Sequence, residues 1–208
     1  SMDLELILEA TGEFVRTLVD YESPYDHFLA GESSALTAKE KAGRDLFFSD
    51  QIGCGDCHGG ADFDEPSTGR HGWVNTGLYN LANGSYPPGR QGLFEWTGKP
   101  EDTGKVRIPT LRHLAFTAPY YHDGSGASLA DVLRNYNAGG RRVESGPYAG
   151  DGRENPFKDP RVRPLGLTDT ELEALEAFLL SLSNPGALER ADWADPWPRE
   201  ELTPPVIP

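Results

Sequence analysis

Long apolar runs are missing from this sequence of 208 residues. No segment approaches the roughly 20 consecutive apolar residues that a helix needs to cross a bilayer. The N-terminal residues also lack the basic and apolar regions of a secretory signal peptide. We therefore expect a chain without a membrane-spanning helix.

Basic residues are scarce: 19 lysines and arginines stand against 33 aspartates and glutamates, and the formal net charge is −14. Such an acidic chain is poorly suited to bind nucleic acid or an anionic membrane surface, because both are negatively charged. A basic protein partner suits this charge better. The composition therefore argues against a nucleic-acid-binding function.

Cysteine is almost absent as well, and the two that occur are Cys54 and Cys57. A disulfide between them would close a very short loop and stabilise the fold little, so the chain is not a disulfide scaffold. His58 follows at once and completes a C-x-x-C-H motif. In this motif both thiols form thioethers with the haem vinyl groups, and the histidine reaches the iron from the proximal side. The sequence predicts one covalently bound haem c.

Two other uses of a C-x-x-C pair fit this sequence less well. A thioredoxin-like dithiol needs a βαβ setting, whereas here a helix-like segment precedes the pair and two glycines follow it. A structural zinc site needs four ligands and usually a second cysteine or histidine pair. The histidines show no such pair; they are His27, His58, His71, His113 and His122. Haem attachment is the favoured interpretation.

The sequence argues against methionine as the second axial ligand of the iron. Methionine often takes this position in cytochromes c, but the one methionine here is Met2, in a Ser-Met pair that resembles a cloning remnant. A histidine, a tyrosine or an open position is left. Tyr136 shares a predicted helix face with Leu129 and Leu133 and is either a ligand or a core tyrosine. His122 lies in a turn-like segment. It is an iron ligand, a proton-transfer group or simply a residue of the turn, and the sequence leaves these three roles open.

Haem propionates are negatively charged and usually pair with arginine or lysine. Arg107 and Arg112 stand in a segment that is well placed in the sequence for this role. A solvated surface charge is the alternative for each of them. We expect propionate contacts from Arg107 and Arg112.

Helical periodicity recurs in four parts of the chain. Apolar residues are spaced as in a helix over residues 4–20. Capping residues begin the other three predicted helices, at Thr37, Ser128 and Thr168. The last of these helices carries the clearest apolar stripe.

The segments between the predicted helices are long. Residues 22–34 read as a connection, and residues 59–105 lose periodicity but carry many glycines and scattered aromatics. An ordered loop wrapped over a large apolar object has this composition, whereas a disordered linker has fewer aromatics. We predict a mainly α, cytochrome c-like haem domain with long ordered loops over residues 1–183, and an extended C-terminal tail over residues 184–208.

Several motifs occur together in an order that resembles one known family. They are the C-x-x-C-H motif, Pro-Thr-Leu-Arg at residues 109–112, Ala-Pro-Tyr-Tyr-His-Asp-Gly at residues 118–124 and Tyr-Asn-Ala-Gly-Gly at residues 136–140. Over residues 4–182 the chain resembles the C-terminal haem domain of bacterial dihaem cytochrome c peroxidases, including the MauG-like branch. The C-x-x-C-H motif is common to all c-type cytochromes, but the second and third motifs together are much more specific.

The resemblance implies roles that spacing alone leaves open. In the MauG-like branch a tyrosine replaces the distal methionine of the C-terminal haem, and the matching residue here is Tyr136. The family also binds calcium between its domains, partly through backbone carbonyls that match Thr117 and Pro119. His122 is expected to assist proton or electron traffic towards the other domain.

The family carries two haem domains, and the N-terminal one, where peroxide usually reacts, has no counterpart in this sequence. We expect a fragment of a dihaem protein or a single-haem relative, and the starting point of the chain favours a fragment. The implied function is haem binding and electron transfer. This transfer would support reduction of hydrogen peroxide or peroxide-driven oxidation of a partner protein.

A stand-alone single-haem electron-transfer cytochrome without peroxidase activity is the alternative function. A single-haem peroxidase with an open iron site ranks last, because the sequence shows no distal Arg/His pair at a recognisable spacing. The expected partners are the N-terminal haem domain, a small cytochrome or copper protein, or an oxidised protein substrate. The expected location is the periplasm, because haem c attachment takes place outside the bacterial cytoplasm.

Overall fold

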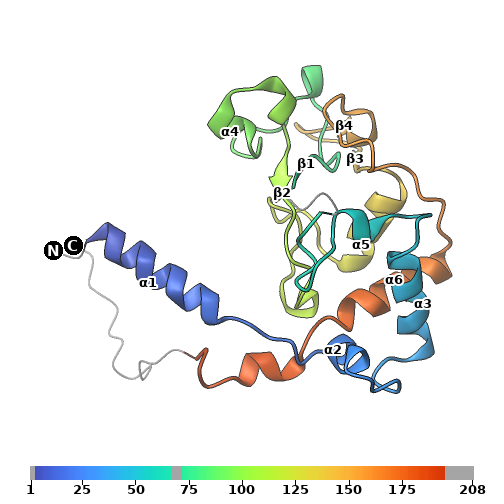
Figure 1. Ribbon diagram of the computed structural model, residues 1–208. Helices are drawn as coiled ribbons and strands as arrows, with labels where there is room; N and C mark the ends of the chain where they lie inside the picture. The colour runs from blue at the N-terminus through green and yellow to red at the C-terminus, as the bar shows by residue number, and fades with distance from the viewer. Residues whose placement is uncertain (1–2, 67–71, 195–208) are drawn as a thin grey trace.

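The computed structural model describes residues 3–66 and 72–194 of the chain (Figure 1). Helices dominate it, and the strands in these residues are short. The α-helices are α1 (Leu4–Thr17), α2 (Pro24–Leu29), α3 (Ala38–Phe47), α4 (Phe94–Thr97), α5 (Leu129–Asn137) and α6 (Asp169–Leu180). The mainly α fold that the sequence predicts is confirmed.

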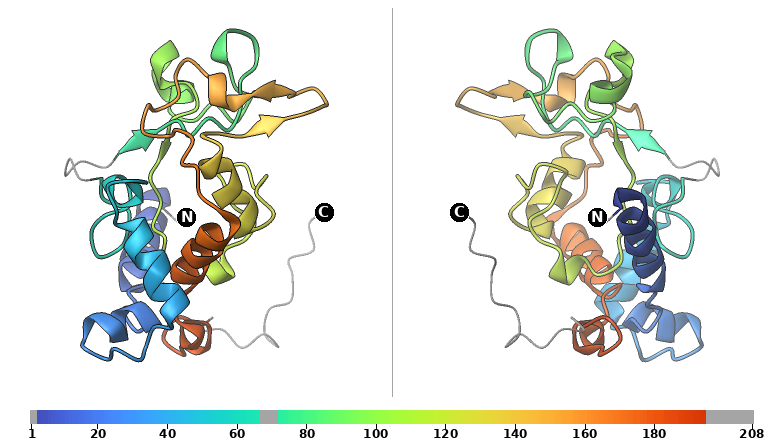
Figure 2. Two further views of the ribbon diagram at one scale, coloured as in Figure 1. Left: turned by 90° about the vertical axis from the view of Figure 1, so that its right-hand side faces the viewer. Right: turned by 90° about the vertical axis from the view of Figure 1, so that its left-hand side faces the viewer.

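Two small antiparallel sheets lie at one end of the molecule (Figure 2). Strand β1 (Trp73–Val74) pairs with β2 (Val106–Arg107), with Val74 opposite Val106. Strand β3 (Arg142–Val143) pairs with β4 (Gly150–Asp151). Each sheet has only two strands, so the sheets tie loops together and the helices build the main core.

Capping residues begin the predicted helices where expected. The Thr37 hydroxyl accepts a hydrogen bond from the Glu40 amide (3.2 Å), and the Glu40 carboxylate accepts one from the Thr37 amide (2.6 Å). Thr168 and Glu171 form the same capping box at α6, and Ser128 caps α5. These side chains satisfy amides that have no partner within the first helical turn, so the sequence signals mark the true boundaries.

The segment expected to be a connection contains helix α2, so that part of the prediction is wrong. Ser23 caps this helix, and Pro24 takes the first helical position, where the lack of an amide donor has no cost. Tyr25 is buried against Phe178 of α6, with ring centroids 5.3 Å apart. Tertiary packing thus stabilises a helix of six residues that is too short to persist alone.

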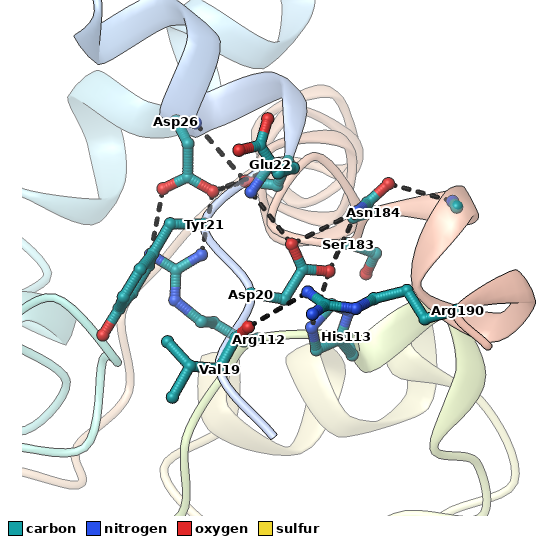
Figure 3. Close-up of polar contacts among 12 residues, drawn as sticks. Val19, Asp20, Tyr21, Glu22, Asp26, Arg112, His113, Ser183, Asn184 and Arg190 are labelled. Carbon is teal, nitrogen blue, oxygen red and sulfur yellow. Dashed lines mark hydrogen bonds and ion pairs between the residues drawn. The ribbon is translucent and has the colours of Figure 1, made fainter. Parts of the chain in front are cut away.

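Helix α1 ends at Thr17, earlier than the periodicity predicts. Leu18 leaves the helical conformation (φ −78°, ψ 61°). Asp20 is buried and accepts a hydrogen bond from the Asn184 side-chain amide at 2.9 Å (Figure 3). The helix itself stands away from the body of the molecule, and none of its residues is buried among the described residues (Figure 1). The chain therefore leaves the helix just before the residue that attaches it to the body of the molecule.

Buried polar side chains order the long segment after the haem motif. The Tyr86 hydroxyl donates to Asn75 Oδ1 (2.6 Å) and accepts from the Leu78 amide (2.9 Å). The Asn75 side-chain amide donates to the Thr103 carbonyl (2.8 Å). Because these buried groups are satisfied, the loop holds its shape with little regular structure. Residues 67–71, which include the candidate His71, lie outside the described residues, as does Met2.

The main core lies between α2, α3 and α6 (Figure 2). The rings of Phe47 and Phe178 pack 5.3 Å apart, and Leu175 is 1 % exposed. The backbone of α3 approaches α6 at Gly43, where a Cβ atom would lie 2.9 Å from Phe178 Cβ and even closer to the Ala174 carbonyl. The apolar stripe predicted for the last helix therefore faces α3 across a contact that needs glycine.

The predicted C-terminal tail begins with a short 3-10 helix at Pro185–Glu189, so this part is not extended. Residues 195–208 lie outside the described residues, and the domain boundary at residue 183 stays a prediction. In the part of the chain that the structure describes, no helix combines the length and apolar character required to cross a lipid bilayer.

We predict that Gly43→Ala destabilises the protein, because the added methyl group overlaps the α6 backbone. The expected loss of unfolding free energy is about 1–3 kcal/mol, measured by urea denaturation. Gly12→Ala in α1 is the matched control, since a Cβ there meets nothing within 4 Å. It should be neutral or stabilising by up to about 1 kcal/mol. Equal effects of the two substitutions would contradict the tight α3–α6 contact.

Candidate haem site

The C-x-x-C-H motif folds as a tight turn directly after α3. Cys54–Asp56 form a 3-10 helix, preceded by Gly53 in the left-handed conformation (φ 63°). The His58 amide donates to the Cys54 carbonyl at 2.9 Å, and the Cys57 amide donates to the same carbonyl at 3.2 Å. This turn brings both thiols and the imidazole together, and no disulfide joins the two cysteines.

The two thiols lie in apolar surroundings. Cys54 packs against the main core, and Cys57 packs against a cluster formed by Val74, Ile108 and Val162. Burial, followed by the nearby Cys57, raises the pKa of the Cys54 thiol to about 12. Both cysteines are therefore neutral thiols at physiological pH, partly buried in an apolar setting.

His58 has the hydrogen bonding that a haem-ligating histidine needs. Its Nδ1 lies 2.8 Å from the Phe63 carbonyl oxygen, and because a carbonyl only accepts, Nδ1 carries the proton. Burial lowers the pKa of His58, against the opposing effect of backbone hydrogen bonds at Phe63 and Pro109. A neutral ring protonated on Nδ1 presents the Nε2 lone pair as the metal donor.

Helix α5 brings Tyr136 to the same place from far along the chain. Tyr136 packs against the cluster of Val74, Ile108 and Val162, to which Cys57 also belongs. Burial raises the pKa of its phenol, and Tyr121 and the two cysteine thiols act in the same direction. The phenol is thus a partly buried neutral group near the C-x-x-C-H turn. A cysteine pair, a tautomerically defined histidine and a tyrosine form a donor set that fits a covalently attached haem.

The two arginines predicted to bind propionates have protein partners. Arg112 is buried, and its guanidinium forms a bidentate pair with Asp26, in which both nitrogen–oxygen distances are 3.0 Å. Arg107 lies 3.4 Å from Asp64 and has an exposed side chain. A propionate would have to compete with these carboxylates, above all at the buried Arg112. Both propionate assignments stay predictions.

The remaining predicted residues lie on exposed backbone before α5. His122 Nε2 lies 3.0 Å from the Arg90 carbonyl, in a turn closed by pairing of Tyr120 with Gly126. Thr117 and Pro119 are exposed. Within residues 3–66 and 72–194, no group of three or more His, Cys, Asp or Glu side chains could hold a metal ion. The role of His122 and the calcium at Thr117 and Pro119 stay predictions.

Sequence reasoning missed the groups that orient the site. Phe63 acts through its backbone carbonyl, which no residue type reveals. Asp26 pairs with Arg112 from a segment that was expected to be a plain connection. The Ser23 and Pro24 capping signal beside Asp26 was the one available indication that this segment is ordered.

The fold and the donor set together define a cytochrome c-like haem domain. Two curated relatives, 34% and 30% identical over 83% and 88% of this chain, show that the chain belongs to the bacterial cytochrome c peroxidase and MauG-like family. A scan against models of protein families found no match.

The relatives share sequence with most of this chain. A cytochrome-c peroxidase, IdrP2, of Denitromonas iodatirespirans is 34% identical over 83% of this chain and 47% of its own length. The methylamine utilization protein MauG of Methylorubrum extorquens is 30% identical over 88% of this chain and 45% of its own length. A crystal structure of a MauG-like protein associated with microbial copper homeostasis aligns with a TM-score of 0.81 and 41% identity, covering 86% of this chain and 53% of that chain. The chain spans about half the length of the curated relatives it matches.

We predict that Asp26→Asn destabilises the protein most strongly near neutral pH. Burial alone would raise the pKa of Asp26, but hydrogen bonds from Arg112 and Ser23 outweigh it and hold the pKa below its usual value. This stabilisation is present above the unfolded pKa of about 3.9 and is lost as the pH falls through the lower folded value. Breaking the buried pair should cost about 3–5 kcal/mol at pH 7 in urea denaturation.

The difference in unfolding free energy between wild type and Asp26→Asn should shrink as the pH falls below about 4. Asp45→Asn removes the carboxylate of the exposed pair with Arg44 and serves as the control, with an expected effect within about 0.5 kcal/mol. If the loss of unfolding free energy caused by Asp26→Asn stays constant from pH 7 to acid, Asp26 does not have the lowered pKa that its pair with Arg112 implies.

Proposed function

We propose that this chain is a haem c domain that transfers electrons in a peroxidase-type oxidoreductase. It would support reduction of hydrogen peroxide or peroxide-driven oxidation of a partner protein. The observation that carries the proposal is the hydrogen bond from His58 Nδ1 to the Phe63 carbonyl (2.8 Å), next to the cysteine pair. Membership of the cytochrome c peroxidase and MauG-like family supports the peroxide chemistry.

Each residue of the donor set has a proposed part. Cys54 and Cys57 would hold the haem through thioethers, and His58 Nε2 would be the proximal ligand. Tyr136 would be the distal ligand, because it packs against the same apolar cluster as Cys57 and its side chain is partly buried there. Bound haem c would supply one-electron redox chemistry, which the side chains themselves cannot perform.

The proposed partners are redox proteins. A net charge of −14 favours a basic surface on a small cytochrome or copper protein, or on an oxidised protein substrate. A second haem domain is a further partner, since the relatives are about twice as long as the matched region. We place the protein in the periplasm, where haem c is attached, and we propose His122 as a group that assists proton transfer.

The alternative function is a stand-alone electron-transfer cytochrome without peroxidase activity. The same donor set of cysteines, histidine and tyrosine would serve either function. The two functions differ in their response to peroxide: a peroxidase-type protein is oxidised by it, and a stand-alone cytochrome is not. A calcium ion on the carbonyls of Thr117 and Pro119 is a separate proposal that rests on family resemblance.

We predict one covalent haem per chain when the protein is produced with a haem c attachment system. The pyridine haemochrome spectrum and the intact mass should both report it, and absence of covalent haem would defeat the proposed function. In the natural gene product that contains this chain, hydrogen peroxide should oxidise the reduced haem. A ferrous spectrum that peroxide leaves unchanged would favour the stand-alone cytochrome instead.

Tyr136→Phe should change the ferric absorption spectrum and raise the reduction potential, because a phenolate ligand stabilises ferric iron. Tyr121→Phe is the matched control, since Tyr121 lines the same small cavity as Tyr136 and accepts a hydrogen bond from Asn135 (3.0 Å). The control should keep the wild-type spectrum. If Tyr136→Phe also keeps it, Tyr136 is not on the iron.

A further inference from the structure

A short loop connects His58 to the carbonyl that orients it. Gly59 and Glu65 close this loop through two backbone hydrogen bonds of 2.9 and 3.2 Å. Phe63 sits inside it in the left-handed conformation (φ 57°), which bulky residues rarely adopt. Phe63 is 2 % exposed, and the centroid of its ring lies 5.9 Å from that of Phe47. The direction of the Phe63 carbonyl therefore depends on contacts that hold an unfavourable backbone conformation.

The two carbonyls directly before Phe63 are held from a distant segment. The Ala61 carbonyl accepts hydrogen bonds from Arg112 Nε (3.0 Å) and Arg112 Nη2 (2.8 Å). The Asp62 carbonyl accepts one from the Thr110 hydroxyl (2.6 Å). The Thr110 oxygen in turn accepts one from the Arg112 amide (3.1 Å). Thr110 and Arg112 thus form one clamp on the backbone of the loop.

The clamp is anchored to helix α2 and to the segment that precedes it. The Arg112 guanidinium pairs with both carboxylate oxygens of Asp26 on α2 and lies over the Tyr21 ring, 4.4 Å from its centroid (Figure 3). The side chains of Arg112 and Asp26 are 8 % and 12 % exposed. The Tyr21 hydroxyl donates to the Asp62 carboxylate at 3.1 Å. The guanidinium is therefore held on several sides while it binds the Ala61 carbonyl.

We propose that Thr110 and Arg112 are positioning residues that fix the orientation and basicity of the His58 imidazole. They act through the loop of residues 59–65, and the proposal rests on His58 being the proximal ligand of the proposed function. A stronger Nδ1–H···O bond makes an imidazole a stronger donor to the metal, because it leaves more negative charge on the ring. Loosening the clamp should weaken this bond and favour the reduced iron.

This assignment differs from the propionate role predicted for Arg112. The guanidinium has five N–H donors, and four hydrogen bonds already run from it to Asp26 and Ala61. If Arg112 acted mainly on a propionate, the Thr110 hydroxyl would have no part in the effect. Thr110 therefore separates the two roles and leaves the buried ion pair intact.

The test uses the haem-loaded protein and measures its reduction potential. Thr110→Val removes the hydroxyl at nearly constant size and should shift the ferric–ferrous equilibrium about tenfold towards ferrous, which is about 59 mV for one electron. Thr110→Ser keeps the hydroxyl and should restore the wild-type potential. Thr97→Val is the control, because this exposed hydroxyl bonds to Asp102 (2.9 Å) away from the loop.

A second readout is the exchange of the His58 Nδ1 proton with solvent, followed by NMR in the ferrous protein. Thr110→Val should speed this exchange about tenfold, whereas Thr97→Val should not change it. Wild-type potential and wild-type exchange in haem-loaded Thr110→Val would overturn the proposal. Equal shifts in Thr97→Val would overturn it too. Failure of the proposed function is detected separately, because a chain without covalent haem is recognised from its haem content before any potential is measured.

Discussion

The buried ion pair between Arg112 and Asp26 holds together three segments that are far apart in the sequence. Asp26 belongs to α2, Arg112 belongs to the segment after β2, and the Ala61 carbonyl belongs to the loop after the haem motif. A buried arginine without its carboxylate would leave an uncompensated charge, so the three segments are constrained to one arrangement. The position of the loop, and with it the carbonyl that orients His58, depends on this constraint.

Two features of the fold bring the donor set together. The end of α3 leads directly into the turn that carries Cys54, Cys57 and His58, and α5 delivers Tyr136 to the cluster against which Cys57 packs. The tight contact of α3 with α6 at Gly43 fixes the helix that precedes the turn. An apolar setting then keeps the histidine neutral and its Nε2 available as a donor.

Local signals predicted three of the helices that side chains cap, but not α2, which Ser23 caps. Thr37, Ser128 and Thr168 mark the starts of α3, α5 and α6 because each satisfies amides of the first turn. Periodicity predicted α1 but placed its end three residues too late, because Leu18 leaves the helical conformation and Asp20 is buried in the body of the molecule. It also missed α2, which depends on packing of Tyr25 against α6. In both places tertiary contacts outweighed the local pattern.

The sequence alone determined which residues are candidates for the chemistry of the site. A C-x-x-C-H motif without other cysteines predicts haem attachment, since both anchors and the ligand stand side by side in the chain. Only the tertiary structure decided how these groups are oriented. The Phe63 carbonyl, the left-handed conformation of Phe63 and the contacts of Thr110 and Arg112 with the loop depend on backbone positions that the residue types of these segments do not reveal. The same structure showed that Arg112, which the sequence favoured for a propionate, is paired with Asp26, because α2 brings that carboxylate within 3.0 Å.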